Sequence, residues 1–352
     1  MSSIYINIPD SIDLNFKKKI EFAILKEINL RNAELKENLL QSIYIKSSKN
    51  DYLSPIFLEA LISSLSSYYS FDNKIEISLE LDFEKIKSQN LLEISKTKVN
   101  RVSFRTYSSL YKNLINVKSN NCFFEKLSLV SNFFQNFSID LIFGIPNFSN
   151  VTLDKLLYKL SEINLSHITL EEYNNVLNNV ACKGKSFNKK LVIDQYNLYC
   201  EKLIEYGFEQ YEYLNFSKNG NYSKQNLNYW KRRPYLGFGP SACSYFNELR
   251  SVNCSDPSEY MIQINKSKKP LNSECLSEKD VYNETIMTGL SISEGLSSLE
   301  IKKKFKSFDS YFQGKLKKHV GLGNLYLEKK FIKVNQEKRY FTDQIAADFF
   351  KI

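Results

Sequence analysis

Glycine is scarce in this sequence: 11 of 352 residues, about 3%, where ordinary proteins have about 7%. The chain therefore has room for few glycine-rich loops of the kind that hold phosphates or cofactors. Cysteines are present but never form a C-x-x-C pair, and the closest two, Cys243 and Cys254, are 11 positions apart. This spacing predicts free thiols and no disulfide framework for all six, which are Cys122, Cys182, Cys200, Cys243, Cys254 and Cys275.

Long apolar runs are also absent. No stretch of about 18 uncharged apolar residues exists, and the start, Met1-Ser2-Ser3-Ile4, lacks the basic segment and cleavage site of a secretory leader. Since 43% of the residues are hydrophobic, the chain can still fill a core. We expect a folded, soluble, cytoplasmic protein without a membrane span.

The net charge of +9 admits an acidic partner, because basic patches attract nucleic acid, anionic lipid and polycarboxylates. Most of the excess, however, is lysine scattered among Asn and Ile, as at Lys17–Lys19 and Lys302–Lys304. Such scatter is typical of solvated helix faces. We therefore expect no nucleic-acid partner.

The first half of the chain alternates short β-branched runs with longer helical patterns, which favours an α/β fold with parallel strands and helical crossovers. Six strands are predicted, at Ile4–Ile8, Ser42–Ile45, Lys74–Leu81, Asn100–Phe104, Phe137–Phe143 and His167–Glu171. Helices are predicted between them, near Leu14–Leu40, Ser54–Tyr68, Phe83–Lys96, Cys122–Phe134 and Thr152–Ile163.

Repeated βα units close into full or partial barrels, whose working residues follow the carboxyl ends of the strands. We expect a partial (β/α)6 TIM-like barrel over residues 1–185 and an aromatic, turn-rich module over 186–275 that opens with a helix near Leu191–Tyr206. A smaller α+β module, winged-helix-like, is predicted over 276–352, with a hairpin around Phe331–Phe341.

Several segments have the pattern of a known family. Ile4–Pro9 reads I-Y-I-N-I-P, and Ser138–Pro146 contains D-L-I-F-G-I-P. The most specific stretch runs from Gly207 to Ala242, with Y-E-x-x-N-F, then N-L-N-Y-W, then Y-L-G-F-G-P-S-A. Together these segments resemble the HemW and oxygen-independent coproporphyrinogen oxidase group of radical-SAM proteins, in order and over nearly the whole chain. The resemblance implies the radical-SAM barrel with a C-terminal extension.

The sequence departs from that family at its first loop. There the family has three cysteines that bind a 4Fe-4S cluster, leaving one iron for S-adenosylmethionine. Here Pro9 runs into Asp10–Leu14, and no cysteine precedes Cys122. Aspartate and serine oxygens replace thiolates poorly at an iron-sulfur site. We therefore expect no 4Fe-4S cluster and no radical chemistry.

Two neighbouring loops have changed as well. Lys46–Asn50 stands where the family has G-G-G-T-P, and Arg105–Ser108 where it has G-x-Q-S. Glu80, Arg101 and Asp140 nevertheless align with residues that contact S-adenosylmethionine in the family. They are either a remnant of that cofactor face or charges that persist because they pair with each other.

The resemblance also points to heme. Gln225 replaces a family histidine associated with heme in the HemW branch, and Cys243 replaces a second histidine. A thiolate can ligate heme iron; alternatively, Cys243 is an ordinary buried thiol. His167 is either a ligand or a hydrogen-bonded core residue, and His319, in a Lys-rich helix, is expected to be solvated.

Aromatic side chains gather in the same region and could cover a porphyrin or simply form core; they are Tyr211, Phe216, Tyr229, Trp230 and Tyr235. Lys231, Arg232 and Arg233 could meet its propionates. Glu212, Asn215 and Asn226 match the family and are expected to position neighbouring backbone.

Three hypotheses follow. The first is a HemW-like heme-binding or heme-delivery protein, working without radical chemistry and passing heme to an unknown acceptor protein. The second is a non-catalytic scaffold or partner-binding remnant. The third is a decaying gene product with little function, which the Lys, Asn and Ile bias would suit.

Overall fold

A computed structural model describes residues 1–9, 13–35, 37–46, 53–105, 120–146, 150–173 and 188–352. Its main sheet has twelve strands in the order β12-β11-β10-β9-β1-β2-β3-β4-β5-β6-β8-β7. The six predicted strands are confirmed as adjacent parallel strands, namely β1 (Ser2–Asn7), β2 (Leu40–Lys46), β3 (Phe71–Asp82), β4 (Arg101–Arg105), β5 (Phe137–Phe143) and β6 (His167–Glu172). The predicted α/β class with a partial barrel is correct.

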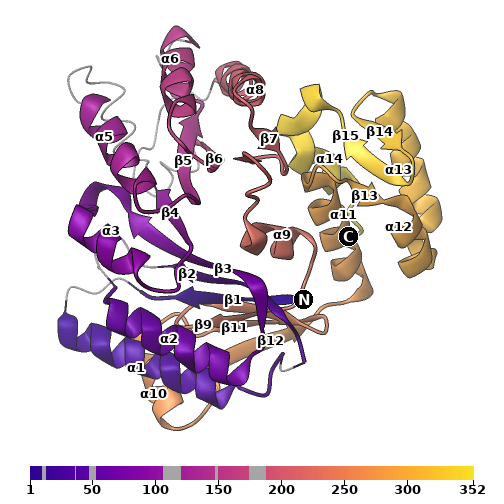
Figure 1. Ribbon diagram of the computed structural model, residues 1–352. Coiled ribbons are helices and arrows are strands. Elements are labelled where there is room, and N and C mark those ends of the chain that lie inside the picture. The colour runs from indigo at the N-terminus through magenta and orange to yellow at the C-terminus, as the bar shows by residue number, and fades with distance from the viewer. Residues whose placement is uncertain (10–12, 36, 47–52, 106–119, 147–149, 174–187) are drawn as a thin grey trace.

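Helices cover the outer face of this curved sheet (Figure 1). They are α1 (Leu14–Leu30), α2 (Pro55–Tyr68), α3 (Ser88–Ser95), α5 (Asn120–Ser131) and α6 (Asn150–Ser161). α2 begins as the sequence suggests, with the Ser54 hydroxyl accepting from the Phe57 backbone N–H and Pro55 in the first turn.

The strands alternate sharply between apolar and polar residues. Ile77 and Leu79 of β3 belong to the outer core beneath the helices, whereas Glu80 faces the barrel interior. Parallel strands covered on both faces are usually apolar throughout. Here only the outer face is apolar, so the inner face encloses a polar cavity.

Two predicted helices are shorter than expected. The helix predicted to reach Leu40 ends at Leu30, because Arg31 turns inward and Leu35 takes a left-handed φ of 54° before β2 begins. The helix predicted over Phe83–Lys96 is split into a 3-10 turn, η1 (Phe83–Lys85), and α3, since Ile86 is extended.

Residues 188–275 add strands to both edges of the barrel sheet. α8 (Lys189–Glu205) leads into β7 (Glu209–Gln210) and β8 (Asn215–Ser217), and β8 pairs with β6. After α9 (Lys224–Trp230), β9 (Tyr235–Phe238) pairs parallel with β1 at the other edge. The sheet continues through β10 (Cys243–Phe246), β11 (Leu249–Asn253) and β12 (Leu271–Cys275), with α10 (Pro257–Asn265) before β12.

A buried carboxylate ties α1 to this added edge. Glu27 pairs with Arg31 at 2.9 Å and accepts from the Asn253 side chain, the Gly239 backbone N–H and the Tyr260 hydroxyl. The network fixes the Tyr235–Ala242 segment against the barrel.

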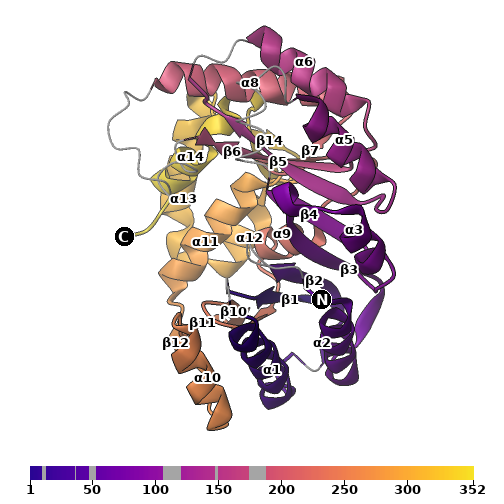
Figure 2. The same cartoon turned by 90° about the vertical axis from the view of Figure 1, so that its left-hand side faces the viewer.

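The C-terminal residues have their own hydrophobic core and a three-stranded sheet, and their helices lie together beside the barrel (Figure 2). Its elements are α11 (Glu278–Ser291), β13 (Leu296–Ser297), α12 (Ser298–Lys304), η3 (Lys306–Phe308), α13 (Asp309–Gly321), β14 (Leu325–Glu328), β15 (Phe331–Val334), η4 (Gln336–Phe341) and α14 (Thr342–Asp348). None of the helices in the described ranges is long and apolar enough to cross a membrane.

Two predictions fail in this C-terminal unit. The hairpin lies at Leu325–Val334, not Phe331–Phe341, because Lys329 adopts the positive φ that a tight turn needs. His319 is buried, not solvated: its Nε2 lies 2.9 Å from Asp348 Oδ2 and its ring stacks on Phe349. α13 turns that face toward α14 while its lysines reach solvent.

Candidate functional site

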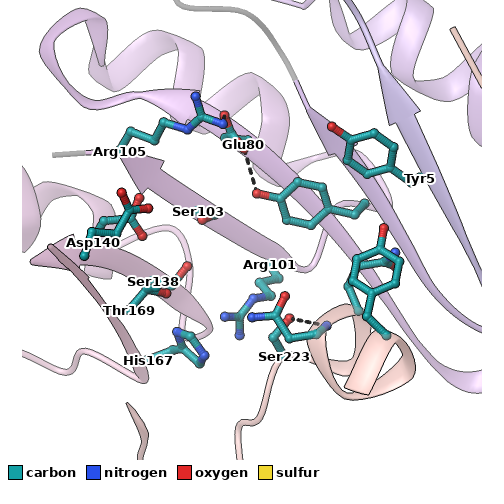
Figure 3. Close-up of a pocket in the computed structure, with 15 residues that line it drawn as sticks. Tyr5, Glu80, Arg101, Ser103, Arg105, Ser138, Asp140, His167, Thr169 and Ser223 are labelled. Atoms are coloured by element: carbon teal, nitrogen blue, oxygen red, sulfur yellow. Dashed lines mark hydrogen bonds and ion pairs between the residues drawn. The ribbon is translucent and has the colours of Figure 1, made fainter. Parts of the chain in front are cut away.

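Two neighbouring cavities lie on the inner side of the barrel sheet. The first, about 220 Å³, is the barrel cavity, and polar side chains from β1 to β6 and from α9 line it (Figure 3). The second, about 640 Å³, is the aromatic cavity, between α9, β9, β10 and α11. Tyr5, Asn226 and Tyr229 line both, so they form the wall that the cavities share.

Glu80 is already engaged within the barrel cavity. The Arg105 guanidinium lies 2.9 Å from one carboxylate oxygen, and the Tyr44 hydroxyl donates to the other at 2.8 Å. Burial and the charge of Glu80 raise the pKa of Tyr44 well above its usual value, so the phenol stays protonated and donates. Asp140 lines the same cavity from β5.

Arg101 and His167 stand at the first positions of β4 and β6 and point into the same space (Figure 3). Arg101 is 2% exposed and donates to the Asn136 side chain at 2.8 Å. The His167 Nε2 lies 2.7 Å from the Tyr211 hydroxyl, and burial beside Arg101 holds the pKa of His167 well below its usual range. His167 is therefore a neutral, hydrogen-bonded interior residue.

Gln225, which replaces the family histidine, is buried in the wall of the barrel cavity. Its Oε1 accepts from the Ser42 hydroxyl at 2.7 Å, and the Asn228 side chain donates to the same hydroxyl at 3.1 Å. These bonds hold α9 against β2.

Aromatic rings form much of the wall of the aromatic cavity. Tyr229 meets Tyr235 edge-on with ring centroids 4.7 Å apart, and Trp230 lines the cavity beside them. By contrast, Tyr211 and Phe216 are core residues that do not line this cavity. The structure thus divides the predicted aromatic cluster into a cavity wall and a core.

Two arginines face a carboxylate across the aromatic cavity. Arg232 lies 3.1 Å from Glu284 and donates to the Tyr245 hydroxyl at 2.7 Å, and Arg250 also pairs with Glu284. The sequence predicted Arg232 but not Arg250 or Glu284. No motif marks those two positions, and only the packing of α11 over the β10–β11 hairpin brings them together.

The other two predicted basic residues point elsewhere. Arg233 donates to Gln41 and Asn228, and Lys231 pairs with Glu294 at 2.6 Å. Neither lines the aromatic cavity.

Cys243 lines the aromatic cavity and is exposed, so the interpretation of it as a buried thiol is wrong. Its side chain lies on the face of β10 that turns toward the aromatic cavity and not toward the core. Partial burial raises the pKa of the Cys243 thiol, while the nearby Arg250 charge lowers it. The other described cysteines, Cys200, Cys254 and Cys275, are also free thiols, as predicted.

Glu212 and Asn215 hold a buried turn between β7 and β8. The Asn215 side chain donates to the Glu212 carboxylate, which also accepts from the Leu214 backbone N–H at 3.3 Å. Burial raises the pKa of Glu212 to about 7. The prediction that these two residues position backbone is confirmed.

Three sequence departures fall wholly or partly outside the described residues. They are Asp10–Ile12 in the first loop, Ser47–Asn50 after β2 and Thr106–Ser108 after β4.

Comparison with known proteins places this geometry in context. No protein-family model matches the chain. It is 24% identical to the heme chaperone HemW of Lactococcus lactis, over 83% of this chain and 80% of that protein. It is also 24% identical to HemW of Bacillus subtilis, over 88% and 85%. A putative HemW-like heme chaperone of Buchnera aphidicola is 22% identical over 98% of both chains.

The fold gives the same answer. Coproporphyrinogen III oxidase, HemN, of Escherichia coli superposes with a TM-score of 0.80 over 99% of this chain and 90% of that one, at 18% identity. The chain therefore resembles the HemW and HemN group in sequence and in fold. The HemN of Escherichia coli is a radical-SAM enzyme. The present chain therefore has the radical-SAM fold that its sequence predicted. The motifs shared with the HemW and HemN group fall on β1, β5, β8, α9 and β9, which frame the two cavities.

Proposed function

We propose that the chain binds heme in the aromatic cavity and does so without radical chemistry. The supporting observation is that the cavity brings Tyr229, Trp230, Cys243 and two arginines to one face. The relatives named as heme chaperones make heme the first ligand to test. A cavity of about 640 Å³ lies in the range that ligand sites of about 300–1,000 Å³ occupy.

The side chains suit a flat, dianionic macrocycle. Aromatic rings would cover its faces, and Arg232 and Arg250 would exchange Glu284 for its propionates. The exposed Cys243 thiol offers an iron ligand after losing its proton. Asn226, in the wall shared with the barrel cavity, would place α9 against the bound ring. His167 lines the barrel cavity and would not reach the iron.

The donor set does not fit a 4Fe-4S cluster at the position that the fold implies. The sequence has no cysteine before Cys122, so the first loop offers oxygen ligands in place of three thiolates. We propose that Glu80, Arg101 and Asp140 are a remnant of the S-adenosylmethionine face. Without a cluster no electron reaches that cofactor, so the chain performs no coproporphyrinogen decarboxylation.

We further propose that the chain delivers heme to an acceptor protein in the cytoplasm. In this proposal residues 1–185 form the barrel, residues 186–275 form the module that holds the ligand, and residues 276–352 form the C-terminal module. The scaffold hypothesis requires instead that the aromatic cavity stays empty of heme.

A heme titration separates these functions, because the single tryptophan, Trp230, lines the cavity and reports on its occupancy. We expect quenching of Trp230 fluorescence and a Soret band that saturates at one equivalent. Cys243→Ala should weaken binding about tenfold and shift the band. Cys275→Ala, a free exposed thiol outside the cavity, is the matched control. No saturable band in the wild type would favour the scaffold.

Iron analysis tests the cluster separately. After anaerobic reconstitution with iron and sulfide, we expect no stoichiometric iron-sulfur absorbance. A full 4Fe-4S signal would overturn the proposed lack of radical chemistry and leave the heme proposal standing.

A further inference from the structure

The barrel cavity contains a buried positive charge without a counterion. Arg101 is 2% exposed, and among the described residues its guanidinium has no carboxylate within ion-pair distance, only the neutral Asn136 side chain. Glu76 lies on the face of β3 that also carries Glu80, and its carboxylate accepts hydrogen bonds from the Ser78 hydroxyl and the Lys224 backbone N–H. A buried charge that lacks a partner is costly, so such a group usually meets a ligand or an ion.

Two further polar atoms in the same wall lack partners. Among the residues that the structure describes, His167 Nδ1 and Gln225 Nε2 are buried and have no hydrogen-bond partner. Both residues line the barrel cavity with Arg101. Buried polar groups are paired in the great majority of proteins. A guanidinium without a counterion and two unpaired polar atoms around one cavity therefore point to an occupant that pairs with all three.

The tautomer of His167 makes its free nitrogen a donor. Burial raises the pKa of Tyr211, so Tyr211 keeps its proton, and the Ser223 backbone N–H interacts with the Tyr211 oxygen. The Tyr211 hydroxyl then donates to His167 Nε2 at 2.7 Å, which leaves the ring hydrogen on Nδ1. Guanidinium, imidazole N–H and amide N–H are all donors, and their common complement is an anion with several acceptor oxygens.

We propose that Arg101, His167 and Gln225 form a binding site for a small oxyanion, a carboxylate or a phosphate group. Hydroxyls of Ser103, Ser138 and Thr169 line the same cavity and can complete the contacts. The cavity, about 220 Å³, limits the ligand to a small molecule. Arg101 and His167 are the first residues of their strands, whereas the Glu80–Arg105 pair lies toward the strands' carboxyl ends. The site shares Arg101 with the proposed remnant of the S-adenosylmethionine face but does not depend on heme binding in the aromatic cavity.

Calorimetric titration of the full, heme-free chain tests the site. Inorganic phosphate and acetate are titrated at constant ionic strength, with chloride as the reference anion. We expect saturable one-to-one binding of phosphate, acetate or both by about 10 mM, and none of chloride. Phosphate alone identifies a phosphate group, and acetate alone a carboxylate. Absence of saturable binding of both anions overturns the proposal.

Variants locate the site. Arg101→Met should weaken binding at least about tenfold, and Gln225→Leu about threefold to tenfold. Arg339→Met is the matched control, because Arg339 is also buried without an ion-pair partner in the described part of the chain but lines neither cavity. Equal binding by Arg101→Met and the wild type would also overturn the proposal. If circular dichroism shows Arg101→Met to be unfolded, unchanged binding by Gln225→Leu overturns it.

Discussion

The guanidinium of Arg105 lies 2.9 Å from the Glu80 carboxylate, and both side chains line the barrel cavity. Arg105, the last residue of β4, stands where the sequence begins to depart from the family pattern, and it pairs with a carboxylate that the resemblance aligns with the family. A residue that differs from the family pattern, Arg105, thus pairs with a residue that matches it, Glu80 on the neighbouring strand β3.

This pair yields the first prediction. Arg105→Met leaves the buried Glu80 carboxylate with only Tyr44 as a partner, so we expect the free energy of unfolding to fall by about 1–2 kcal/mol. Lys333→Met breaks the exposed Lys333–Glu328 pair and should cost less than about 0.5 kcal/mol. Urea denaturation measures both, and equal losses would mean that Glu80 does not depend on Arg105.

The Glu27 network predicts a larger effect. Glu27→Gln removes the charge that faces Arg31 and weakens bonds from three other donors, so we expect a loss of about 3 kcal/mol. Glu34→Gln is the matched control, since Glu34 pairs with the same arginine near the surface and should cost about 1 kcal/mol or less. A loss below that of Glu34→Gln would contradict the network's role.

The backbone conformation at Gly239 leads to a third prediction about stability. Its φ is +94°, and a Cβ there would collide with the Asn7 backbone oxygen on β1. Gly239→Ala should therefore cost about 2 kcal/mol or more. Gly314 lies in α13 with open space around it, so Gly314→Ala should stabilise by about 0.5–1 kcal/mol. Thermal unfolding should move in opposite directions for the two variants, and a shared direction would refute the clash.

Glu212 predicts a dependence on pH. Burial raises its pKa to about 7 from an ordinary value of 4.5, so between these values the folded chain binds more protons than the unfolded chain. The contribution of Glu212 to stability is therefore full below about pH 4.5 and is lost as pH rises through 7. Glu212→Gln should flatten this fall, with urea midpoints measured at pH 5, 6, 7 and 8.

Glu209→Gln, at an exposed position nearby, is the control and should keep the wild-type slope. If Glu212→Gln also keeps that slope, the carboxyl titrates normally and its raised pKa is wrong.

Local sequence was sufficient for the strands and much of the framework. Alternation of apolar and polar residues marks β3 and β5 because successive side chains of a strand face opposite sides of a sheet. The absence of cysteine before Cys122 is also a property of sequence alone, as is the Tyr235–Ala242 pattern that carries the family resemblance.

Local sequence misplaced elements where a turn competes with helix propensity. Leu35 and Lys329 have a positive φ, which neither leucine nor lysine favours, so the sequence did not predict these turns. As a result, the first helix ends earlier, and the hairpin lies earlier, than predicted. His319 was misjudged because the burial of a helix face depends on what packs against it.

The sites were decided by tertiary structure. Arg250 and Glu284 meet only because α11 packs over the β10–β11 hairpin, and Arg101, His167 and Gln225 converge only because strand order and α9 bring them to one cavity. The sequence specifies the chemistry of each side chain, but the free-energy cost of burying a charge depends on which groups surround it in the folded chain. The sequence therefore determined the family resemblance and the absence of cysteine before Cys122, while folding determined which of the described charges are paired and which, such as Arg101, meet no carboxylate.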